Sequence, residues 1–584
     1  MDDQTAMTRG RGTTRAAARQ GCARGGDESM GAGRRPSRIP GRRATLLGCL
    51  AAMAVGVSCG PLPDTCEELG TCAAPDASTT AGRCNPMTDP KDEACVLDGA
   101  YGVFVASGAD LDGGSPASEA GISAGDGTTQ HPFGTIAEGL AHLEGKSRVY
   151  VCNGVYNEQV SITTAVSVYG GLSCAGTSSG RVWSYVGQSA QVSSPSPAYA
   201  LSVAAVDGGS VTIEDLSFAA PDATKAGASS LAALIASSTV NFRRVTLIAG
   251  KGANGANGAD GFAHPNYTGT APDGGEQAVP GPPDSGAFVA AAGAGAINQC
   301  MGFGLSVGGQ GGVGCASGPG NPGLGTPGTA TPPPPPILAG RDGQPRGAIL
   351  ADGGTVANND PGADGLAGAG GVPAQDYGTL SPSGWSPSAG GDGDPGGPAQ
   401  GGAGATDPIY GSCGSPEGLG GGGGGAGGCG GSGGQGGGGG GASVALASVA
   451  STLDLAACTL VAAAGGIGGA GGSGQDGQAG GAGGDANRLA SHAAGASGGD
   501  GAGGSGGAGG TGGISVDLLD IGSTITSDMA TTQNARAGVP GLGGPAGMPG
   551  KHGAGVVLAT GMDGHSGAPG RAGTAASRLD LVSP

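Results

Sequence analysis

The chain has 584 residues, of which 136 are Gly and 39 are Pro, while 3% are aromatic and 12% are charged. This composition excludes the several conventional globular domains that such a length would suggest, because Gly adds no side chain to a core and loses the most backbone freedom on folding. The net charge of −19 predicts a surface that repels nucleic acid and anionic lipid headgroups, so we expect no nucleic-acid partner.

The N-terminal region, residues 1–58, has the pattern of a signal or leader. Five Arg residues between positions 34 and 43 precede an apolar run over residues 44–57, which ends at Ser58 and Cys59. A basic segment followed by an apolar one and then by small residues is the plan of a signal peptide. The run is too short to span a membrane as a stable helix. We therefore expect export.

The end of this run resembles a bacterial lipoprotein signal, in which Cys59 would be lipidated. Gly56 stands where that family usually has Leu, and Arg42-Arg43 with Leu46-Leu47 also resembles a twin-arginine export motif. The resemblance implies an outer-membrane or cell-surface lipoprotein, or a secreted protein, with envelope lipid as its partner through the anchor. The alternative for Cys59 is a disulfide bond after ordinary cleavage.

Without residues 1–58 the chain holds 16 basic and 41 acidic residues, a net charge of −25. Solubility outside the cell and weak Ca²⁺ binding are the consequences that we expect from this excess of carboxylates. The six His residues are scattered without the paired spacing of a metal site. We expect no cofactor and no dedicated metal site.

The cysteines of the exported part fall in local clusters, which in an oxidising compartment predict disulfide bonds. The candidates are Cys66, Cys72, Cys84, Cys95, Cys152, Cys174, Cys300, Cys315, Cys413 and Cys429. A zinc site is the rival interpretation, but the clusters lack a Cys-x-x-Cys pair and a nearby His. A bridge from Cys300 to Cys315 would contribute roughly 3 kcal/mol. Cys458 is expected to be a buried, unbonded thiol.

Residues 59–99 have the composition of a Cys-containing spacer, and ordered structure is predicted from about residue 100. Alternating apolar residues predict a strand over residues 102–105. Ile136 and Leu140 are at helical spacing after Thr135, a suitable N-cap, so a short helix is expected to plug one end of the fold.

Short strands separated by tight bends follow the helix, at residues 148–152, 160–162 and 166–169. Such a set makes one coil of a parallel β-helix. An apolar pattern then occurs three times, because residues 210–218 align with 239–247 and with 452–460. Recurring units of this kind predict stacked coils, each too small to bury its apolar face alone.

The chain from Phe104 through residues 131–136, 149–151, 154–158 and 168–171 resembles the N-terminal part of pectate-lyase-like right-handed β-helix proteins. The exported, uncharacterised group of myxobacteria and relatives is the type that it resembles in particular. The resemblance covers about residues 100–250 and recurs at 442–464. It implies an all-β, right-handed parallel β-helix, a solenoid, and is nearly silent on activity.

We therefore place the N-terminal part of the β-helix at residues 100–264 and a further coil at 442–464. A last coil strand is expected within residues 514–530. Residues 265–441 form a Gly/Pro-rich, low-complexity insertion, of which 265–410 is predicted to be loop or linker without a fold of its own. Residues 531–584 are a Gly/Pro-rich tail.

Gly holds every third position from Gly465 to Gly483 and from Gly498 to Gly513, within an array over residues 465–513. The array resembles the Gly-rich repeats of mycobacterial PGRS proteins, which implies layered polyglycine II helices. In that form neighbouring backbones approach closely enough for N–H to C=O bonds between helices. Disorder is the alternative. A collagen-like pattern with Pro occurs only over residues 541–553.

The aligned copies place Glu214 and Asp215 next to Arg243 and Arg244 on adjacent coils. Acids and bases so placed serve catalysis in carbohydrate-active β-helices, where a carboxylate binds Ca²⁺ and a base takes a proton. The alternative is ion pairing at a solvated bend, worth about 0 to 1 kcal/mol. We favour ion pairing, because the third copy has residues 456–457, two Ala, at this place.

Other motifs carry little chemistry. Asn157 and Glu158 suit a turn. The Gly-Asp motifs at residues 391–394 and 474–477 are similar to calcium-binding β-roll repeats, but the full nonapeptide does not recur in register. We expect a non-enzymatic structural or adhesion protein of the cell surface, with extracellular polysaccharide or matrix as a partner. The alternatives are a polysaccharide lyase or hydrolase, and ice or surface binding by ordered polyglycine helices.

Overall fold

The computed structural model describes residues 84–107, 125–177, 180–262, 269–276, 292–300, 304–312, 325–331, 361–405, 420–485, 494–533, 541–553 and 561–581. The leader, Cys59 and the disulfide candidates Cys66, Cys72, Cys315 and Cys413 lie outside these residues.

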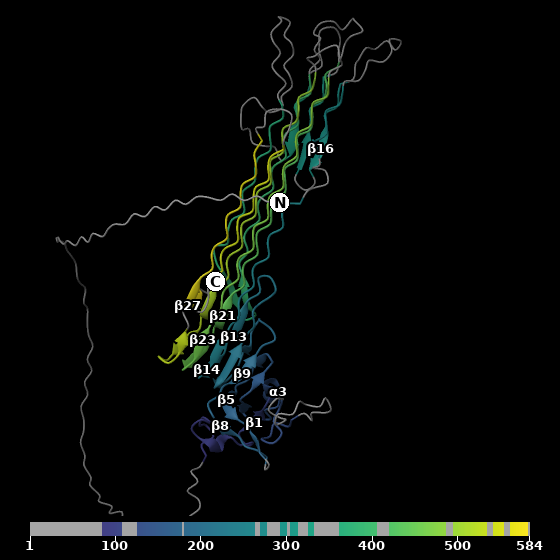
Figure 1. Ribbon diagram of the computed structural model, residues 1–584. Helices are drawn as coiled ribbons and strands as arrows, with labels where there is room; N and C mark the ends of the chain where they lie inside the picture. Colours follow the sequence, from purple (N-terminus) through teal and green to yellow (C-terminus); the bar gives the residue numbers. More distant parts are fainter. Residues whose placement is uncertain are drawn as a thin grey trace, which may run out of the picture. The chain divides into compact units, whose positions relative to one another are not determined.

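Three sheets of mainly parallel strands dominate the described chain (Figure 1). The first contains β1 (Gly102–Val105), β2 (Arg148–Cys152), β5 (Ser167–Ser173), β11 (Val211–Glu214), β14 (Thr239–Arg243), β22 (Thr452–Ala456) and β25 (Thr524–Ser527), with β8 (Ser184–Tyr185) antiparallel to β5. The second contains β3 (Val155–Tyr156), β9 (Ala190–Ser193), β12 (Leu216–Ala219), β15 (Thr246–Ile248), β23 (Thr459–Val461) and β26 (Thr532–Gln533). The third contains β4 (Val160–Ile162), β10 (Leu201–Ala204), β13 (Ser230–Ala236), β21 (Ser443–Val449), β24 (Ser515–Ile521) and β27 (Ala575–Leu581).

The remaining elements are small. They are the hairpin of β6 (Gly176–Thr177) and β7 (Gly180–Arg181), the antiparallel sheet of β16 (Ile297–Cys300), β17 (Gly304–Val307) and β18 (Thr329–Thr331), the hairpin of β19 (Gly378–Ser381) and β20 (Gly384–Pro387), the 3-10 helix η1 (Ala94–Val96) and the helix α3 (Ile136–Ala141).

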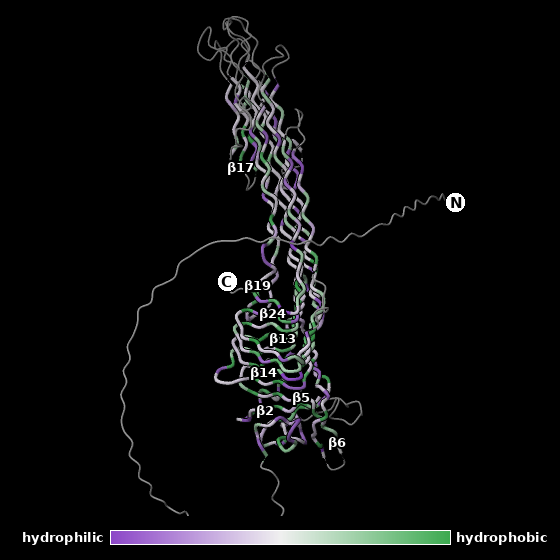
Figure 2. The backbone as a smooth tube through the Cα atoms, turned by 90° about the vertical axis from the view of Figure 1, so that its left-hand side faces the viewer, coloured by the Kyte–Doolittle hydropathy of each residue, from purple (hydrophilic) through white to green (hydrophobic). Residues whose placement is uncertain are grey.

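From β2 onward the chain visits the three sheets in turn, so each pass through them makes one coil (Figure 2). Val240 of β14 pairs with Val211 of β11, and Thr239 pairs with Thr452 of β22. The alignment of the three sequence copies is therefore the register of the strands, and all three belong to one contiguous stack. Thr524 of β25 pairs with Thr452 and begins a further coil. The all-β, parallel arrangement is the one expected of a parallel β-helix.

Apolar side chains from all three sheets fill the interior of the coils. The largest of those that are fully buried include Ile162, Leu201, Ile213, Leu216, Phe218 and Phe242. At the β1 end this cluster includes Ile136 of α3. The helix begins with the predicted N-cap, because the Thr135 hydroxyl accepts the Glu138 N–H and the Glu138 carboxylate accepts the Thr135 N–H. The expected plug is thus confirmed.

The glycine-rich parts of the chain leave the coils at one corner. Between β15 and β21, between β23 and β24, and again between β26 and β27, the chain departs after a strand of the second sheet and returns to begin a strand of the third. Figure 2 shows these segments as long, roughly parallel tubes. The long insertion therefore loops out without interrupting the stack.

Backbone hydrogen bonds join the glycine-rich segments with a period of three residues. The N–H groups of Gly466, Gly469 and Gly472 donate to the carbonyl oxygens of Gly441, Gly438 and Gln435. The pattern of one bond for every third residue continues along the segments and is the one expected of polyglycine II helices. The two predicted arrays, 465–483 and 498–513, are therefore ordered by backbone hydrogen bonds, as expected of polyglycine II helices and not of a disordered chain. We call these joined segments the glycine bundle.

The segments in the interior of the glycine bundle are the richest in Gly. Residues 494–513 exchange backbone bonds with segments on all sides, namely 361–371, 391–403, 425–440, 466–484, 541–553 and 562–571. A Cβ atom on Gly504 would lie 2.0 Å from the Ser432 carbonyl oxygen. Real Cβ atoms do not approach so closely, so only Gly fits there.

Two expectations for the low-complexity regions are wrong. Residues 361–405, expected to be linker, hydrogen-bond into the glycine bundle, and the hairpin of β19 and β20 places Trp385 against the outer face of the third sheet. The tail of residues 531–584 contributes β27 to the third sheet and the segment 541–553 to the glycine bundle. Both errors arose because low side-chain complexity does not limit hydrogen bonding by the backbone.

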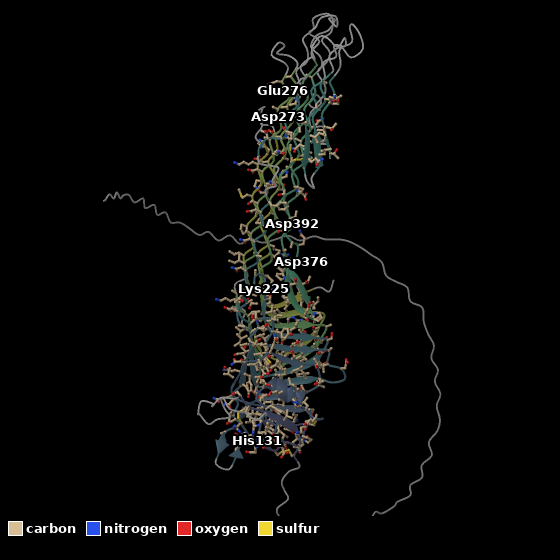
Figure 3. The ribbon with its side chains drawn as sticks, turned by 90° about the vertical axis from the view of Figure 1, so that its right-hand side faces the viewer. His131, Lys225, Asp273, Glu276, Asp376 and Asp392 are labelled. Carbon is tan, nitrogen blue, oxygen red and sulfur yellow. A yellow bond between two sulfur atoms is a disulfide. The ribbon has the colours of Figure 1, made fainter. Side chains whose placement is uncertain are left out.

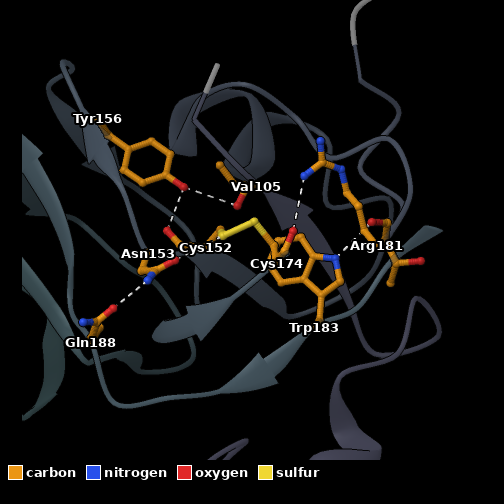
Figure 4. Close-up of a disulfide and its surroundings, with 9 residues drawn as sticks. Val105, Cys152, Asn153, Tyr156, Cys174, Arg181, Trp183 and Gln188 are labelled. Atoms are coloured by element: carbon orange, nitrogen blue, oxygen red, sulfur yellow. Dashed lines mark hydrogen bonds between the residues drawn. A yellow bond between two sulfur atoms is a disulfide. The ribbon is translucent and has the colours of Figure 1, made fainter. Parts of the chain in front are cut away.

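Disulfide bonds link Cys84 to Cys95 and Cys152 to Cys174, within two of the predicted clusters. Figure 4 shows the second bond beside Trp183, whose ring covers it. The expected bridge from Cys300 to Cys315 is wrong, because Cys300 bonds to Cys429.

The two segments lie side by side at this bond, where Asn298 of β16 donates its side-chain N–H to the Gly427 carbonyl, 2.9 Å away. Cys458 is buried and unbonded, as predicted.

Candidate functional site

The bend between the first and second sheets brings the predicted charged residues together. Asp215, Arg244 and Ala457 occupy this bend in three successive coils with φ values of 54°, 55° and 53°. A left-handed residue turns the chain sharply from one sheet into the next. Because the bend is the same in each coil, Asp215 and Arg244 lie on adjacent rungs, as the aligned copies predicted.

Arg244 is the centre of the cluster. Its guanidinium lies 2.8 Å from an Asp215 carboxylate oxygen, 2.9 Å from Glu214 and 3.0 Å from Asp89. Arg243, which is in register with Glu214 on the neighbouring strand, lies further away, at 3.7 Å. The structure therefore joins all four predicted residues and adds Asp89, which comes from the N-terminal side of the coils.

A solvated bend was expected here, and that expectation is wrong for the two carboxylates, whereas the Arg243 and Arg244 side chains are 49% and 31% exposed. Only 3% of Glu214 and 5% of Asp215 are exposed. The residues 84–97, which we call the N-terminal segment, lie over this part of the first sheet. The Arg148 side chain donates to the carbonyl oxygens of Pro86 and Thr88.

The Tyr150 hydroxyl fixes the other end of the N-terminal segment by donating to the Val96 carbonyl. Leu97 packs on the aromatic cluster of Phe104, Tyr150 and Tyr169. The segment is therefore held to the first sheet by polar contacts along its length and by apolar packing at its end.

Burial controls the charge state of the cluster. Burial, with the hydrogen bond and negative charge of Asp89, raises the pKa of Glu214 to about 8. Burial also opposes ionisation of Asp89, but hydrogen bonds from Glu214, the Lys91 N–H and Arg244 outweigh it and lower its pKa. The hydrogen bond to Asp215 raises the pKa of Arg244. At neutral pH, Glu214 is therefore a protonated acid beside an ionised Asp89.

A protonated acid among carboxylates and Arg is a familiar catalytic set, but its surroundings here favour ion pairing. Every carboxylate of the set already bonds to Arg244, and Glu214 and Asp215 are buried. Ala456 and Ala457 on the next coil do not extend it. The arrangement neutralises buried charge and ties the N-terminal segment to two coils.

The other motifs have structural partners. The carboxylate of Glu158 accepts the N–H groups of Ile136 and Ala137 at 2.8 and 3.0 Å, so it completes the start of α3. In the Gly-Asp motifs, Asp392 accepts the Gly436 N–H at 2.7 Å and Asp476 accepts the Lys551 N–H at 2.7 Å.

Figure 3 shows Asp392 and Asp273 on the long glycine segments. Asp273 in turn accepts the Ala482 N–H at 2.7 Å. These carboxylates therefore pair neighbouring backbones of the glycine bundle.

Sequence reasoning missed a ladder of side-chain acceptors along the glycine bundle. Asn254, Asn257 and Asp260 accept the N–H groups of Ile467, Ala470 and Ser473, at 2.9, 3.0 and 2.6 Å. Their three-residue spacing, in phase with Gly, was the available signal. These side chains accept backbone N–H groups of the segment 467–473, in the place of the carbonyl oxygens that accept such groups in the interior of the glycine bundle.

Sequence reasoning also missed a buried carboxyl in the third sheet, because only the fold reveals its burial. Asp517 of β24 is 2% exposed, accepts the Ala462 N–H at 3.0 Å, and has one carboxyl oxygen without a partner among the described residues. Burial raises the pKa of Asp517 to about 6.

Within the described ranges, Cys84, Glu93 and Cys95 are the group close enough together to hold a metal ion, but the two sulfurs are bonded to each other. No helix of the described chain is long and apolar enough to cross a membrane. No protein-family model, curated protein or solved structure matches the chain.

Proposed function

We propose that the protein is an exported, lipid-anchored and non-enzymatic protein of the cell surface, with a role in envelope structure or in adhesion to extracellular polysaccharide or matrix. The observation that carries the proposal is the glycine bundle, which is rooted in the coils and ordered by backbone hydrogen bonds. The segment from Ala464 to Asp485 spans roughly 70 Å at the rise of such a helix. A stiff projection of this length suits the display of a contact surface.

The side chains of the glycine bundle support adhesion. Ile467, Leu542 and Met548 are 45%, 66% and 67% exposed. The residues 467 and 542 belong to neighbouring segments, because the Gly468 N–H donates to the Leu542 carbonyl. Large apolar side chains exposed on neighbouring segments supply apolar contact area of the kind that interaction surfaces use.

The finer identity is also a proposal. The leader pattern ending at Cys59, the local disulfides and the parallel coils together favour a pectate-lyase-like β-helix protein of the exported type, with PGRS-like repeats. The net negative charge of the exported part favours solubility outside the cell.

Cell-surface display and adhesion are tested together in cells that produce the full chain. We expect labelled palmitate to be incorporated and externally added protease to cleave the protein. Cys59→Ser would abolish the label. Binding of the cells to a polysaccharide matrix would fall several-fold in the double variant Leu542→Ser, Met548→Ser. The proposal fails if the protein stays inside the cell or if the double variant binds as wild type does.

Met529→Ser is the matched control, because Met529 is fully exposed but lies in the turn after β25. Catalysis is tested on purified protein with pectins, alginates and glycosaminoglycans, with and without Ca²⁺. Cleavage that depends on Ca²⁺ and is lost in Arg243→Ala would replace the proposed role by that of a polysaccharide-active enzyme.

A regular face of ordered polyglycine helices also favours a second candidate, the binding of ice or another periodic surface. The acceptor ladder places side chains at every third residue of one segment. Growth rates of ice crystals in the presence of the purified protein test this candidate, which predicts slowed growth.

A further inference from the structure

Two carboxyl groups from distant parts of the sequence contact one guanidinium, and a hydrogen bond between them contributes to the raised pKa of Glu214. Asp89 lies on the N-terminal segment and Glu214 ends β11, and both contact Arg244, at 3.0 and 2.9 Å. Glu214 is buried and Asp89 is largely so, with 14% of its side chain exposed. A hydrogen bond between two carboxyl groups requires that one of them holds a proton.

We propose that Asp89 and Glu214 form a proton-dependent latch, which holds the N-terminal segment on the first sheet at mildly acidic pH and loosens it as the pH rises. The proton on Glu214 is the element that closes the latch. If Cys59 carries a lipid as proposed above, the latch also controls how tightly the chain that leads from the anchor is held to the coils.

Among the five side chains that the ion pairs join, three carboxyls and two guanidiniums, the charges balance only when Glu214 is protonated. Asp89 and Asp215 then face two guanidinium groups, Arg244 at 2.8 to 3.0 Å and Arg243 beside Glu214. Ionisation of Glu214 adds a third carboxylate in a buried place and removes the proton that bonds it to Asp89. Repulsion between like charges at short range then opposes docking of the N-terminal segment.

Other titratable groups around Glu214 do not change their charge near neutral pH. Those that face the cluster are Tyr169 of β5, Tyr185 of β8, Arg148 of β2, and Lys91 and Asp92 of the N-terminal segment. Burial raises the pKa values of Tyr169 and Tyr185, so both remain neutral. Lys91 pairs with Asp92 at 2.6 Å, and those charges cancel.

The direction of the pH dependence follows from linkage. The pKa of Glu214 rises from 4.5 in its ordinary state to about 8 in the folded protein. Between these values the docked state binds more protons than the released state. Because release of the N-terminal segment removes Asp89 and uncovers Glu214, the stability of docking declines as the pH rises toward about 8.

Amide hydrogen exchange of the full chain tests the latch. The amides of Asp92, Glu93 and Val96 are bonded within the N-terminal segment and report its order. After correction for the intrinsic rate, we expect their protection to fall at least tenfold between pH 5.5 and 7.5, since one linked proton changes an equilibrium about tenfold per pH unit at most. In Glu214→Gln, whose amide donates at any pH, we expect high protection throughout.

Glu158→Gln is the matched control, because Glu158 is also a partly buried carboxyl whose pKa is raised by burial, but it contacts α3. This variant should follow the wild type. Amides of β13, in the middle of the stack, show in each variant that the coils remain folded. Protection that is constant with pH in the wild type, or that falls equally in Glu214→Gln, would overturn the proposal.

Discussion

Side-chain packing orders the coils, whereas backbone hydrogen bonding orders the glycine bundle. In the coils, side chains such as Phe218 and Phe242 fill an apolar interior, and the strands bring them there. In the glycine bundle, the absence of side chains lets backbones approach until N–H and C=O groups pair at every third residue. The coils are thus stabilised by buried apolar side chains, and the glycine bundle by backbone hydrogen bonds that the absence of side chains permits.

The two regions also differ in which substitutions they tolerate. A coil is less restrictive on its outer side, where the aligned copies differ, as at Thr212, Asn241 and Asp454. The interior of the glycine bundle accepts almost none, because a Cβ atom at Gly504 or at Gly424 would lie 2.0 Å from a neighbouring carbonyl oxygen. The high Gly content, which by itself suggests disorder, is therefore what allows these backbones to pack closely.

The largest effect is expected from removing a core side chain of the coils. Phe242 is 1% exposed in the interior cluster, and Phe242→Ala should lower the free energy of unfolding by about 3 to 5 kcal/mol, through lost burial and the cavity left behind. Chemical denaturation followed by far-ultraviolet circular dichroism measures it. Thr239→Ala on the exposed side of the same strand is the control. A loss below about 1 kcal/mol in Phe242→Ala would contradict the core role of the coils.

A smaller but more local effect is expected from adding one methyl group to the glycine bundle. Gly504→Ala forces the residues 432 and 504 apart, and we expect a loss of about 1 to 3 kcal/mol. Amide exchange should accelerate over residues 494–513 and their neighbours, while β13 stays protected. Gly99→Ala is the control, because a Cβ atom there would meet no atom within 4 Å. Unchanged exchange in Gly504→Ala would mean that the segments are not packed closely.

The register of the coils was predictable because it is local and repeated. Apolar positions at fixed spacing aligned residues 210–218, 239–247 and 452–460, and the strands pair in that register. A last coil strand was correctly expected within residues 514–530, where β24 and β25 lie. Its alignment with the three copies was missed because polar residues replace apolar ones there, as where Ser527 pairs with Leu455.

Contacts across long stretches of sequence were not predictable. Asp89 reaches Arg244 across 155 residues and Cys300 reaches Cys429 across 129. Neither pair repeats, so no periodicity marks it. Burial of Glu214 by the N-terminal segment likewise depends on a region whose composition is that of a spacer. The candidate site was thus recognised by its residues, whereas its charge state depended on the fold.

The smallest effect concerns the edge of the glycine bundle, where side chains take over the pairing of the backbone. Asn257→Ala removes the acceptor of the Ala470 N–H, 3.0 Å away. Because Asn257 is exposed, water replaces part of the bond, and we expect a loss of about 0.5 kcal/mol. Exchange of the Ala470 amide should accelerate about twofold, with the amides of β13 unchanged.

Asn257→Asp tests whether the side-chain oxygen at position 257 is what protects the Ala470 amide. The carboxylate retains an oxygen acceptor at the same place, as Asp260 does for the Ser473 N–H at 2.6 Å, so the Ala470 amide should exchange as slowly as in the wild type. Equal acceleration in Asn257→Ala and Asn257→Asp would show that the oxygen is not what protects the edge. The edge of the glycine bundle would then be ordered by backbone hydrogen bonds alone, as its interior is. The polar side chains of Asn254, Asn257 and Asp260 would serve solubility and not the pairing of segments.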